Sequence, residues 1–388
     1  MGPSYRTGVN QAGVRNHNER LVLTLIHRGG AMPAVDIARR AGLSSQTVSV
    51  ILRGLEDDGI LRREAPLRGQ VGKPRVPVAL RPDGVLSLGL KIGRRSAELV
   101  LMDIAGEVRG RRHLSYDRPM PEPILGFLDQ EAETLAASLP QTARERLTGI
   151  GIAMPFELWS WPEALGATTA EMEVWRAFDL AAAIAEFTSL PVLIENDGTA
   201  AARAEHVFGV DADLVDFAAF FVGTFVGGGL VLNGRVYAGP DGNAGALGSL
   251  PVPGGQLIDT ASLYLLERAL REDGRAPGML WDPSQDWGMI EDRLVPWIET
   301  AAQGLAAGIV SVAAVLDCRR VVIDGSVPQT VRARLVAAVR ARLAEGDLRG
   351  ITPPIVAEGS IGPSAQAIGA AALPIFDRYL LEGPTAHG

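Results

Sequence analysis

Residues 32–61 read MPAVDIARRAGLSSQTVSVILRGLEDDGIL, and the spacing of apolar and small residues in this stretch decides the fold of the first part of the chain. Apolar positions recur at helical spacing on both sides of Gly42, which predicts two short helices joined by a tight turn. Ser44 is a good N-cap for the second helix. We therefore predict a helix-turn-helix. The positions that this motif needs are Ile37, Ala38, Gly42, Val48, Ile51 and Leu55.

The flanking segments extend the motif. NERLVLTLIHRGG, residues 18–30, predicts a further helix that ends at the Gly29-Gly30 pair, because glycine commonly follows the last helical turn. ILRREAPLRGQVGKPRVPVALRP, residues 60–82, predicts two extended stretches joined by a loop that carries glycine, lysine and arginine. Such a basic hairpin is typical of a winged helix-turn-helix. The alternative is an ordinary three-helix bundle, in which similar apolar positions arise by chance.

A winged helix-turn-helix commonly binds DNA, and the charge distribution supports that function for this segment. Residues 1–84 hold 13 Lys and Arg against 7 Asp and Glu, whereas the rest of the chain holds 24 against 38. Since cations that neutralise phosphates supply most non-specific affinity for nucleic acid, we expect only the first segment to bind double-stranded DNA. The predicted DNA-binding residues are Ser45, Gln46, Thr47, Ser49 and Arg53 on the second helix, and Arg68, Lys73 and Arg75 on the wing.

Length and composition restrict the class of protein. A chain of 388 residues is longer than single hydrophobic cores usually grow, so two or three domains are expected. No apolar run approaches the ~18 residues that cross a bilayer, and the first 20 residues lack the apolar core of a secretory signal. The single cysteine, Cys318, excludes a disulfide within the chain. We therefore expect a cytoplasmic protein.

From about residue 85 onward, strand and helix patterns alternate. VLSLGLKIGRRSAELVLMDIAGEV, residues 85–108, predicts two strands around a glycine turn, and FAAFFVGTFVGGGLVLNGRVY, residues 217–237, repeats that layout. We therefore expect two similar α/β halves, each with a covered, mostly parallel sheet. The apolar segment TAAQGLAAGIVSVAAVL, residues 300–316, predicts a buried helix in preference to part of an oligomer face.

The order of several short motifs resembles the ROK family of repressors and sugar kinases. The motifs are the winged helix-turn-helix ending in GKP, then LGLKIGRRSAELVLMDIAGEV, IGIAMP, LPVLIENDGTAAARAE, VGTFVGGGLVLNG, GNAGALG and VVIDGSV. The resemblance implies an α/β protein with a winged helix-turn-helix domain at residues 1–84. A two-lobed, actin-like, ribonuclease-H-like ATPase fold then follows, with a sugar cleft between its lobes. The implied lobes span residues 85–205 and 206–388, and the C-terminal helix returns to the first lobe.

The sequence departs from the kinases of this family at both phosphate loops. In the first loop the resemblance implies an acidic residue and a Gly-Thr step, where this chain has Lys91 and Arg94. A cation cannot ligate Mg²⁺, and bulky arginines fill space that phosphate needs. Phe225 in the second loop and Phe156 after IAMP each replace a usual glycine. We therefore predict that the protein is not an enzyme and has no cofactor.

The sugar site is only partly preserved. The resemblance implies sugar contacts at Asn196 and Asp197, although Asp197 has an equally good alternative role as a cap of the helix that follows. In GNAGALGSL, residues 242–250, Ala246 and Ser249 replace the family's glutamate and histidine. The next loop, LPVPGGQLID, lacks the cysteines that hold zinc in the family, so no metal is expected. The predicted effector contacts are Asn196, Asp197, Asn243, Ser249 and Asp259.

These observations together predict a sequence-specific repressor of carbohydrate uptake or catabolism genes, released by a small molecule in the interlobe cleft. Three ligand alternatives stay open: an anionic or less polar molecule helped by Lys91, Arg94 or Arg95, a different sugar, or no ligand. An effector-independent regulator is the alternative function, and an ATP-dependent sugar kinase is a distant one. We expect a homodimer or homotetramer whose DNA half-sites lie ~34 Å or a multiple apart.

Overall fold

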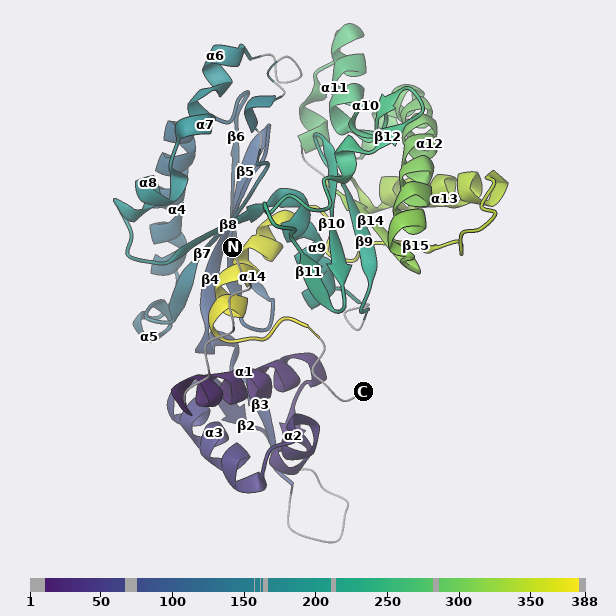
Figure 1. Ribbon diagram of the computed structural model, residues 1–388. Helices are drawn as coiled ribbons and strands as arrows, with labels where there is room; N and C mark the ends of the chain where they lie inside the picture. The colour runs from purple at the N-terminus through teal and green to yellow at the C-terminus, as the bar shows by residue number, and fades with distance from the viewer. Residues whose placement is uncertain are drawn as a thin grey trace, which may run out of the picture.

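The computed structural model describes residues 11–66, 75–156, 158–160, 162, 167–210, 214–281 and 286–383. A small helical domain at the N-terminus lies beneath two α/β lobes, which stand side by side (Figure 1). The N-terminal domain is purple in Figure 1, and the C-terminal helix, in yellow, lies between the lobes and reaches down toward that domain.

The N-terminal domain is a winged helix-turn-helix. Gly42 ends the second helix in the left-handed conformation (φ 65°), and Ser44 caps the third helix by accepting a hydrogen bond of 3.1 Å from the Thr47 N–H. Ile37 and Val48 are fully buried, so the predicted motif and its core positions are confirmed. The elements are α1 (Gln11–Gly29), α2 (Ala34–Ala41), α3 (Ser45–Asp57), and the sheet β1 (Met32–Pro33), β3 (Pro77–Leu80), β2 (Leu61–Arg63).

The two lobes have sheets of the same design. Three antiparallel strands are followed by two parallel ones in each sheet, which confirms the two similar halves. The prediction of mostly parallel sheets was wrong, because tight turns join the first three strands of each half and only helical crossovers produce parallel neighbours. The first sheet runs β6 (Val108–Ser115), β5 (Ser96–Asp103), β4 (Leu86–Ile92), β7 (Leu147–Met154), β8 (Val192–Asn196), and the second β11 (Arg235–Tyr237), β10 (Val226–Leu232), β9 (Phe217–Val222), β14 (Arg320–Gly325), β15 (Ile355–Glu358).

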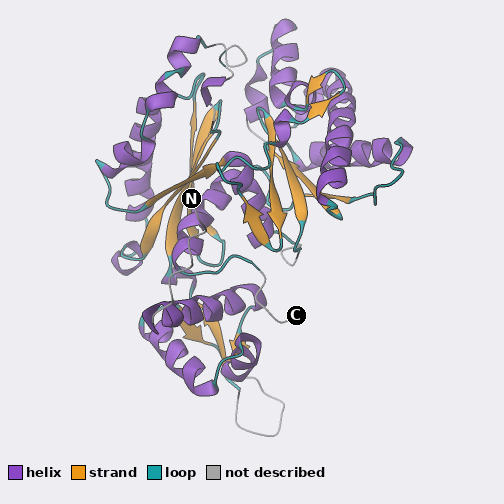
Figure 2. Ribbon diagram, in the orientation of Figure 1, coloured by secondary structure: helices purple, strands orange, loops and turns teal. Residues whose placement is uncertain are grey.

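Helices cover the outer faces of both sheets, and α9 and α14 lie between the sheets (Figure 2). The first lobe has α4 (Pro121–Ala137), α5 (Gln141–Arg144), α6 (Thr169–Met172), α7 (Val174–Ala177) and α8 (Leu180–Ala185). The second has α9 (Asp197–Phe208), α10 (Ile258–Ala261), α11 (Leu263–Glu272), α12 (Glu291–Leu316), α13 (Gln329–Glu345) and the small hairpin β12 (Pro251–Val252), β13 (Gly255–Gln256). The C-terminal helix α14 (Ala365–Arg378) follows these elements in sequence but packs on the first sheet. Single 3₁₀ turns occur at Pro82–Gly84, Leu158–Ser160, Leu247–Ser249, Pro277–Trp281 and Trp287–Ile290.

Helix α14 packs against β4 and β7 of the first sheet and against α9. Its close approach depends on glycine, since a Cβ at Gly151 would overlap the Ala370 carbonyl. One buried apolar cluster combines residues of the N-terminal domain, such as Ile26 and Leu55, with Met102 of β5 and Ile375 of α14. The N-terminal domain therefore shares its core with the lobe above it. The domain bounds at 84/85 and 205/206 stay a prediction.

Helix α12, with 26 residues, is the longest of the described helices. The segment Trp287–Leu316 is long and apolar enough to cross a membrane by length and composition, but 56% of its most apolar window is buried inside the protein. It packs against α10, α11 and α13, and Ala301, Leu305 and Ile309 are fully buried. The helix is therefore a core element of the second lobe, as residues 300–316 predict.

Candidate functional site

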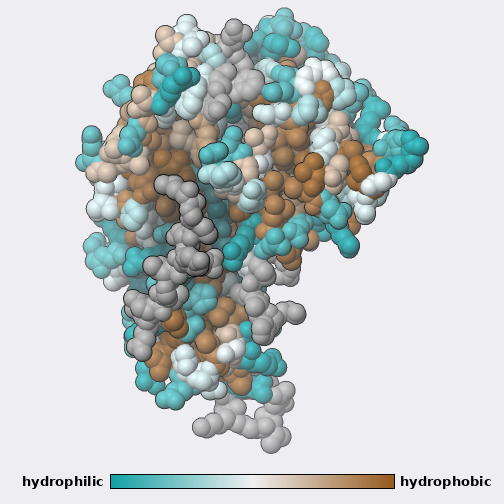
Figure 3. All heavy atoms as spheres, viewed as in Figure 1, coloured by the Kyte–Doolittle hydropathy of each residue, from teal (hydrophilic) through white to brown (hydrophobic). Residues whose placement is uncertain are grey.

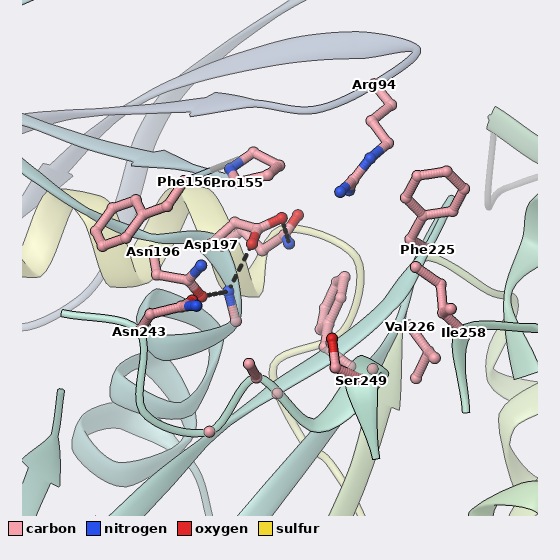
Figure 4. Close-up of a pocket in the computed structure, with 18 residues that line it drawn as sticks. Arg94, Pro155, Phe156, Asn196, Asp197, Phe225, Val226, Asn243, Ser249 and Ile258 are labelled. Carbon is pink, nitrogen blue, oxygen red and sulfur yellow. Dashed lines mark hydrogen bonds between the residues drawn. The ribbon is translucent and has the colours of Figure 1, made fainter. Parts of the chain in front are cut away.

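A small cavity lies between the lobes where β8 meets α9 (Figure 4). Its volume is about 140 Å³. Glycines of β10 and of the loop after β11 form one wall, and Pro155 and Phe156, which follow β7, form another. The polar side chains that line it are Arg94, Asn196, Asp197, Asn243, Ser249 and Gln366. Four of the five predicted effector contacts are therefore brought together.

Asn196 and Asp197 are both tied to the start of α9. Asn196 is the N-cap: its Oδ1 accepts hydrogen bonds from the amides of Gly198 (2.9 Å) and Thr199 (3.3 Å). Asp197 Oδ1 also accepts from the Gly198 amide at 2.9 Å, while Oδ2 accepts from Gln366 Nε2 at 3.0 Å. Asp197 thus supports the helix start with one oxygen and faces the cleft with the other. Its contact with an effector stays a prediction.

The electrostatics around Asp197 are set by burial and by two cations. Burial raises the pKa of the Asp197 carboxyl, and the positive charges of Arg94 and Lys91 oppose that shift. Burial also lowers the pKa of Arg94 to about 10 and lowers that of Lys91. The Arg94 guanidinium lies over the Phe225 ring, 4.0 Å from its centre, so Phe225 supports a cation where the kinase resemblance implies glycine.

Backbone packing explains the small residues of the loop at 242–250. Gly245 has a φ of 78°, and a Cβ there would lie 2.8 Å from the Gly229 Cα. A Cβ at Gly248 would overlap the carbonyl of Val226. The loop therefore lies directly on β10, which requires glycine whether or not a ligand is bound.

Asp259 is not part of the cavity. It is exposed in α10, and its Oδ2 accepts a hydrogen bond from the Gln256 amide at 3.0 Å. Its neighbour Ile258 faces the cavity instead, because successive residues of a helix point about 100° apart. Gln366 was missed from the sequence, since nothing in its local pattern links it to Asp197, 169 residues earlier.

A second, larger cavity adjoins the first on the side of β4 and β5. Its volume is about 600 Å³, and the two cavities share Arg94, Asp197, Phe225 and Gln366. Arg95 lines neither; its Nη2 forms an ion pair of 3.1 Å with Glu267 Oε1 of α11, across the two lobes. No group of three or more His, Cys, Asp or Glu side chains within the described ranges is arranged to hold a metal ion.

The predicted DNA-reading face lies on α3. Ser45, Gln46, Ser49 and Arg53 are exposed, whereas Thr47 is half-buried. Two hydroxyls are used within the helix: Thr47 Oγ1 shares a hydrogen bond of 2.8 Å with Ser44 Oγ, and Ser49 Oγ donates to the Ser45 carbonyl at 2.7 Å. Gln46 and Arg53 are thus the longest outward side chains of the set.

Of the three DNA-binding residues predicted on the wing, the structure describes Arg75. Arg75 is exposed just before β3. Arg68 and Lys73 lie outside the described residues. The contribution of the wing to DNA binding therefore stays a prediction.

The N-terminal domain is anchored to the rest of the protein by two arginines. Arg20 of α1 donates through Nη2 to the carbonyls of Phe376 (2.7 Å) and Leu380 (2.6 Å) at the end of α14. Arg146, just before β7, donates through Nη1 to the carbonyls of Asp58 (2.9 Å) and Gly59 (3.1 Å), which follow α3. Both contacts join a helix of the N-terminal domain, or the turn that follows one, directly to the rest of the protein.

Comparison with known proteins agrees with this geometry. The ROK family matches residues 87–262, and the MarR family matches residues 16–67. The chain is 29% identical to the uncharacterized protein y4fQ of Sinorhizobium fredii over 96% of this chain and 93% of that protein. It is 24% identical to the xylose repressor of Bacillus subtilis, over 63% of this chain and 62% of the repressor.

Kinases are also among the similar proteins: the N-acetylmannosamine kinase of Escherichia fergusonii is 28% identical over 62% of this chain and 83% of the kinase. Among solved structures, a ROK family transcriptional regulator, a homologue of the Escherichia coli MLC protein, has a TM-score of 0.68 at 21% identity. That match covers 94% of this chain and 97% of the regulator, and it supports the two-lobed, actin-like fold. The chain therefore carries a ROK family domain in residues 87–262, preceded by a MarR-type winged helix DNA-binding domain in residues 16–67.

Proposed function

We propose that this protein is a transcriptional repressor that binds an operator through α3 and the wing and is released by a small, sugar-like effector in the interlobe cleft. The similarity to the xylose repressor supports a repressor that responds to a carbohydrate. The proposed effector contacts are Asn196, Asp197, Asn243 and Ser249, which line the smaller cavity.

One observation carries this proposal: a single helix contacts both the cleft and the DNA-binding domain. At one end of α14, Gln366 donates to Asp197; at the other end, Arg20 of α1 holds the Phe376 and Leu380 carbonyls. With 14 residues, α14 spans about 20 Å. Because α14 contacts α9 at one end and α1 at the other, we infer that a ligand which shifts α9 against α14 also shifts α1.

The effector acts by differential binding. A ligand that binds better when the lobes are closed shifts the protein toward that arrangement. In an assembly of two or four chains, the paired α3 helices must then leave the ~34 Å spacing of adjacent major grooves.

The homodimer or homotetramer stays a proposal. The second lobe exposes Met289 (83%), Val315 (82%) and Ile355 (65%), and hydrophobic residues, in brown, lie on this lobe in Figure 3. Met289 and Val315 lie near opposite ends of α12, which is about 39 Å long, so these side chains are exposed singly and do not by themselves define a subunit interface.

We infer that the protein does not phosphorylate sugars. Support comes from Lys91 and Arg94, which put two cations beside Asp197 in the part of the cleft where a kinase must place Mg²⁺ and nucleotide phosphates. A coupled assay with ATP, Mg²⁺ and a panel of sugars tests this point. Turnover that disappears in an Asp197→Asn variant would make the protein a kinase.

The main experiment measures DNA binding by the full chain. Duplexes selected from a random pool, and the DNA upstream of its own gene, are titrated at several salt concentrations. We expect a sequence-specific complex whose affinity falls steeply with salt. A sugar that weakens the complex in the wild type but not in Asp197→Ala supports an effector-controlled repressor. A specific complex that no ligand weakens would leave an effector-independent regulator, and the absence of any specific complex would overturn the proposal.

A further inference from the structure

We propose that the larger interlobe cavity holds the anionic group, a phosphate or a carboxylate, of a ligand whose hydroxyl-bearing body lies in the smaller cavity. This inference rests on the proposed function, because it names the class of effector: a polyhydroxylated small molecule with one anionic group. The geometry that supports it is the position of Arg94 and Asp197 on the boundary between the two cavities.

The sizes of the cavities fit such a ligand. The larger one has a volume of about 600 Å³, within the range of ~300 to 1,000 Å³ typical of small-molecule sites. The smaller one, at about 140 Å³, is lined by the Asn196 and Asn243 amides and the Ser249 hydroxyl, which suit ligand hydroxyl groups. Since the cavities share four lining residues, one molecule can occupy both.

Two cations at this boundary have no carboxylate partner within ion-pair distance among the described residues. Within the described part of the chain, Lys91 Nζ donates to Ser96 Oγ alone, at 3.2 Å. The Arg94 guanidinium lies over Phe225 (Figure 4), and its buried Nε has no hydrogen-bond partner among the residues that the structure describes. Burying cations without partners is costly, and a guanidinium can bind a phosphate or carboxylate with two parallel hydrogen bonds. A bound anion would therefore supply both Lys91 and Arg94 with a partner of opposite charge.

Unlike Arg94, the neighbouring Arg95 and Arg111 each form an ion pair with a carboxylate. Arg95 forms an ion pair of 3.1 Å with Glu267, and Arg111, on the wall of the larger cavity, forms one of 3.1 Å with Glu98. Glu98 also accepts a hydrogen bond of 2.8 Å from Ser364 Oγ, so its charge is compensated within the protein. The uncompensated charge on this wall is thus positive.

The remaining polar lining suits an anion. Hydroxyl groups can donate to phosphate or carboxylate oxygens without adding charge. Hydroxyl residues that line the larger cavity and whose proton is not given to a protein acceptor in the described structure include Ser96, Thr224 and Ser326, whereas Ser364 Oγ already donates to Glu98. Asp197 is the one carboxylate common to both cavities among the described residues, and Gln366 already holds its Oδ2.

Calorimetry with the full chain tests the inference. The probes are inorganic phosphate, ATP with Mg²⁺, and two matched series: D-glucose, D-glucose 6-phosphate and D-glucuronate, and D-xylose, D-xylose 5-phosphate and D-xylonate. The variants are Arg94→Gln and Lys91→Met. Arg112→Gln is the matched control, because Arg112 pairs with Glu131 at 2.8 Å and does not line the cavity.

We expect at least one charged sugar to bind about 10- to 100-fold more tightly than its neutral parent, which is the effect of one or two charge-assisted hydrogen bonds. Arg94→Gln and Lys91→Met each remove most of that advantage, and Arg112→Gln keeps it. Whether the phosphorylated or the carboxylated member gains more distinguishes the two anions. Equal binding of charged and neutral members, no binding of any anion, or an advantage that survives in both variants overturns the inference. Arg94-dependent binding of ATP, with no charged sugar bound, assigns the cavity to nucleotide and also overturns it.

The DNA complex separates this inference from the proposed function. A neutral sugar that releases operator DNA while charged sugars bind no better leaves the repressor intact and removes the anion site. A charged sugar that binds through Arg94 but leaves DNA affinity unchanged keeps the anion site and removes its role as effector.

Discussion

Gln366 Nε2 donates a hydrogen bond of 3.0 Å to Asp197 Oδ2, which ties the first turn of α14 to the first turn of α9 inside the cleft. The two residues are 169 positions apart in sequence. Since Asp197 also holds the Gly198 amide, a ligand that engages Asp197 acts on both helices at once.

Arg53→Ala tests the reading face. Arg53 is exposed on α3, so its removal should leave the free energy of unfolding unchanged within about 0.5 kcal/mol. Loss of a base or phosphate contact should lower operator affinity by about 10- to 100-fold, which fluorescence anisotropy with a labelled duplex measures. Arg112→Ala, in the ROK domain, serves as the control and should keep full affinity. Unchanged DNA affinity of Arg53→Ala would remove this residue from the interface.

Arg20→Ala tests the connection through α14. The variant loses the hydrogen bonds to the Phe376 and Leu380 carbonyls, while the cleft remains intact. We expect the effector to bind as in the wild type but to weaken the DNA complex less, because α1 loses its Arg20 hydrogen bonds to the end of α14 while the shared apolar core remains. Calorimetry measures the affinity for the effector, and fluorescence anisotropy measures the affinity for DNA with and without the effector. Arg15→Ala, whose side chain is 74% exposed on the same helix, is the control. Full release of DNA by Arg20→Ala would contradict the connection.

The pair Arg95–Glu267 is predicted to hold the two lobes together. Its side chains are 13% and 3% exposed, so removing Arg95 leaves a buried carboxylate with Arg271 as its remaining ion-pair partner. Arg95→Ala should lower the free energy of unfolding by about 1 to 3 kcal/mol. A double-mutant cycle with Glu267→Gln in urea should give a coupling energy above about 1 kcal/mol. The exposed pair Arg334–Glu291, with side chains 42% and 50% exposed, should give less. Equal coupling energies for the two pairs would refute the prediction that the Arg95–Glu267 pair holds the lobes together.

His27 should make stability depend on pH. Its ring packs against Phe208 and Phe376, and burial lowers the pKa of His27 from 6.5 to about 4. Because the unfolded chain takes up the proton first, the stability that neutral His27 contributes is present above pH 6.5 and is lost as the pH falls toward 4. The loss is about 2 kcal/mol at pH 5. Urea unfolding at pH 7 and pH 5 should show this extra loss in the wild type and not in His27→Leu. The exposed His17 is the control position. Parallel losses in wild type and His27→Leu would disprove the assignment.

Two adjacent glycines of β10 should respond differently to alanine. A Cβ at Gly228 would overlap the Ala219 carbonyl and lie 2.5 Å from Leu247 Cδ1, whereas a Cβ at Gly227 meets nothing within 4 Å. Gly228→Ala should therefore lower the free energy of unfolding by about 1 to 3 kcal/mol or more, and Gly227→Ala should change it by less than about 0.5 kcal/mol. Thermal and urea unfolding of both variants measure the difference. Similar stabilities would mean that the loop at 242–250 does not need its close packing on β10.

The sequence by itself determined the features that depend on neighbours along the chain. Helical spacing around Gly42, the cap at Ser44 and the Gly29-Gly30 pair at the end of α1 are local signals, and the structure has all of them. The repeated hairpin pattern likewise determined the two similar halves. Each of these signals acts within a few residues, so no knowledge of the packed chain is needed to interpret it.

Only the tertiary structure decided which side chains meet. Gln366 forms a hydrogen bond with Asp197, and Asp259 lies outside the cavity. Arg95 pairs with Glu267, whereas Arg94 faces the cleft. The mixed sheets and the core shared between the N-terminal domain and α14 were also decided there. The physical reason is that these contacts join segments far apart in sequence. Their partners are selected by the packing of whole helices and sheets, which no local pattern of residues encodes.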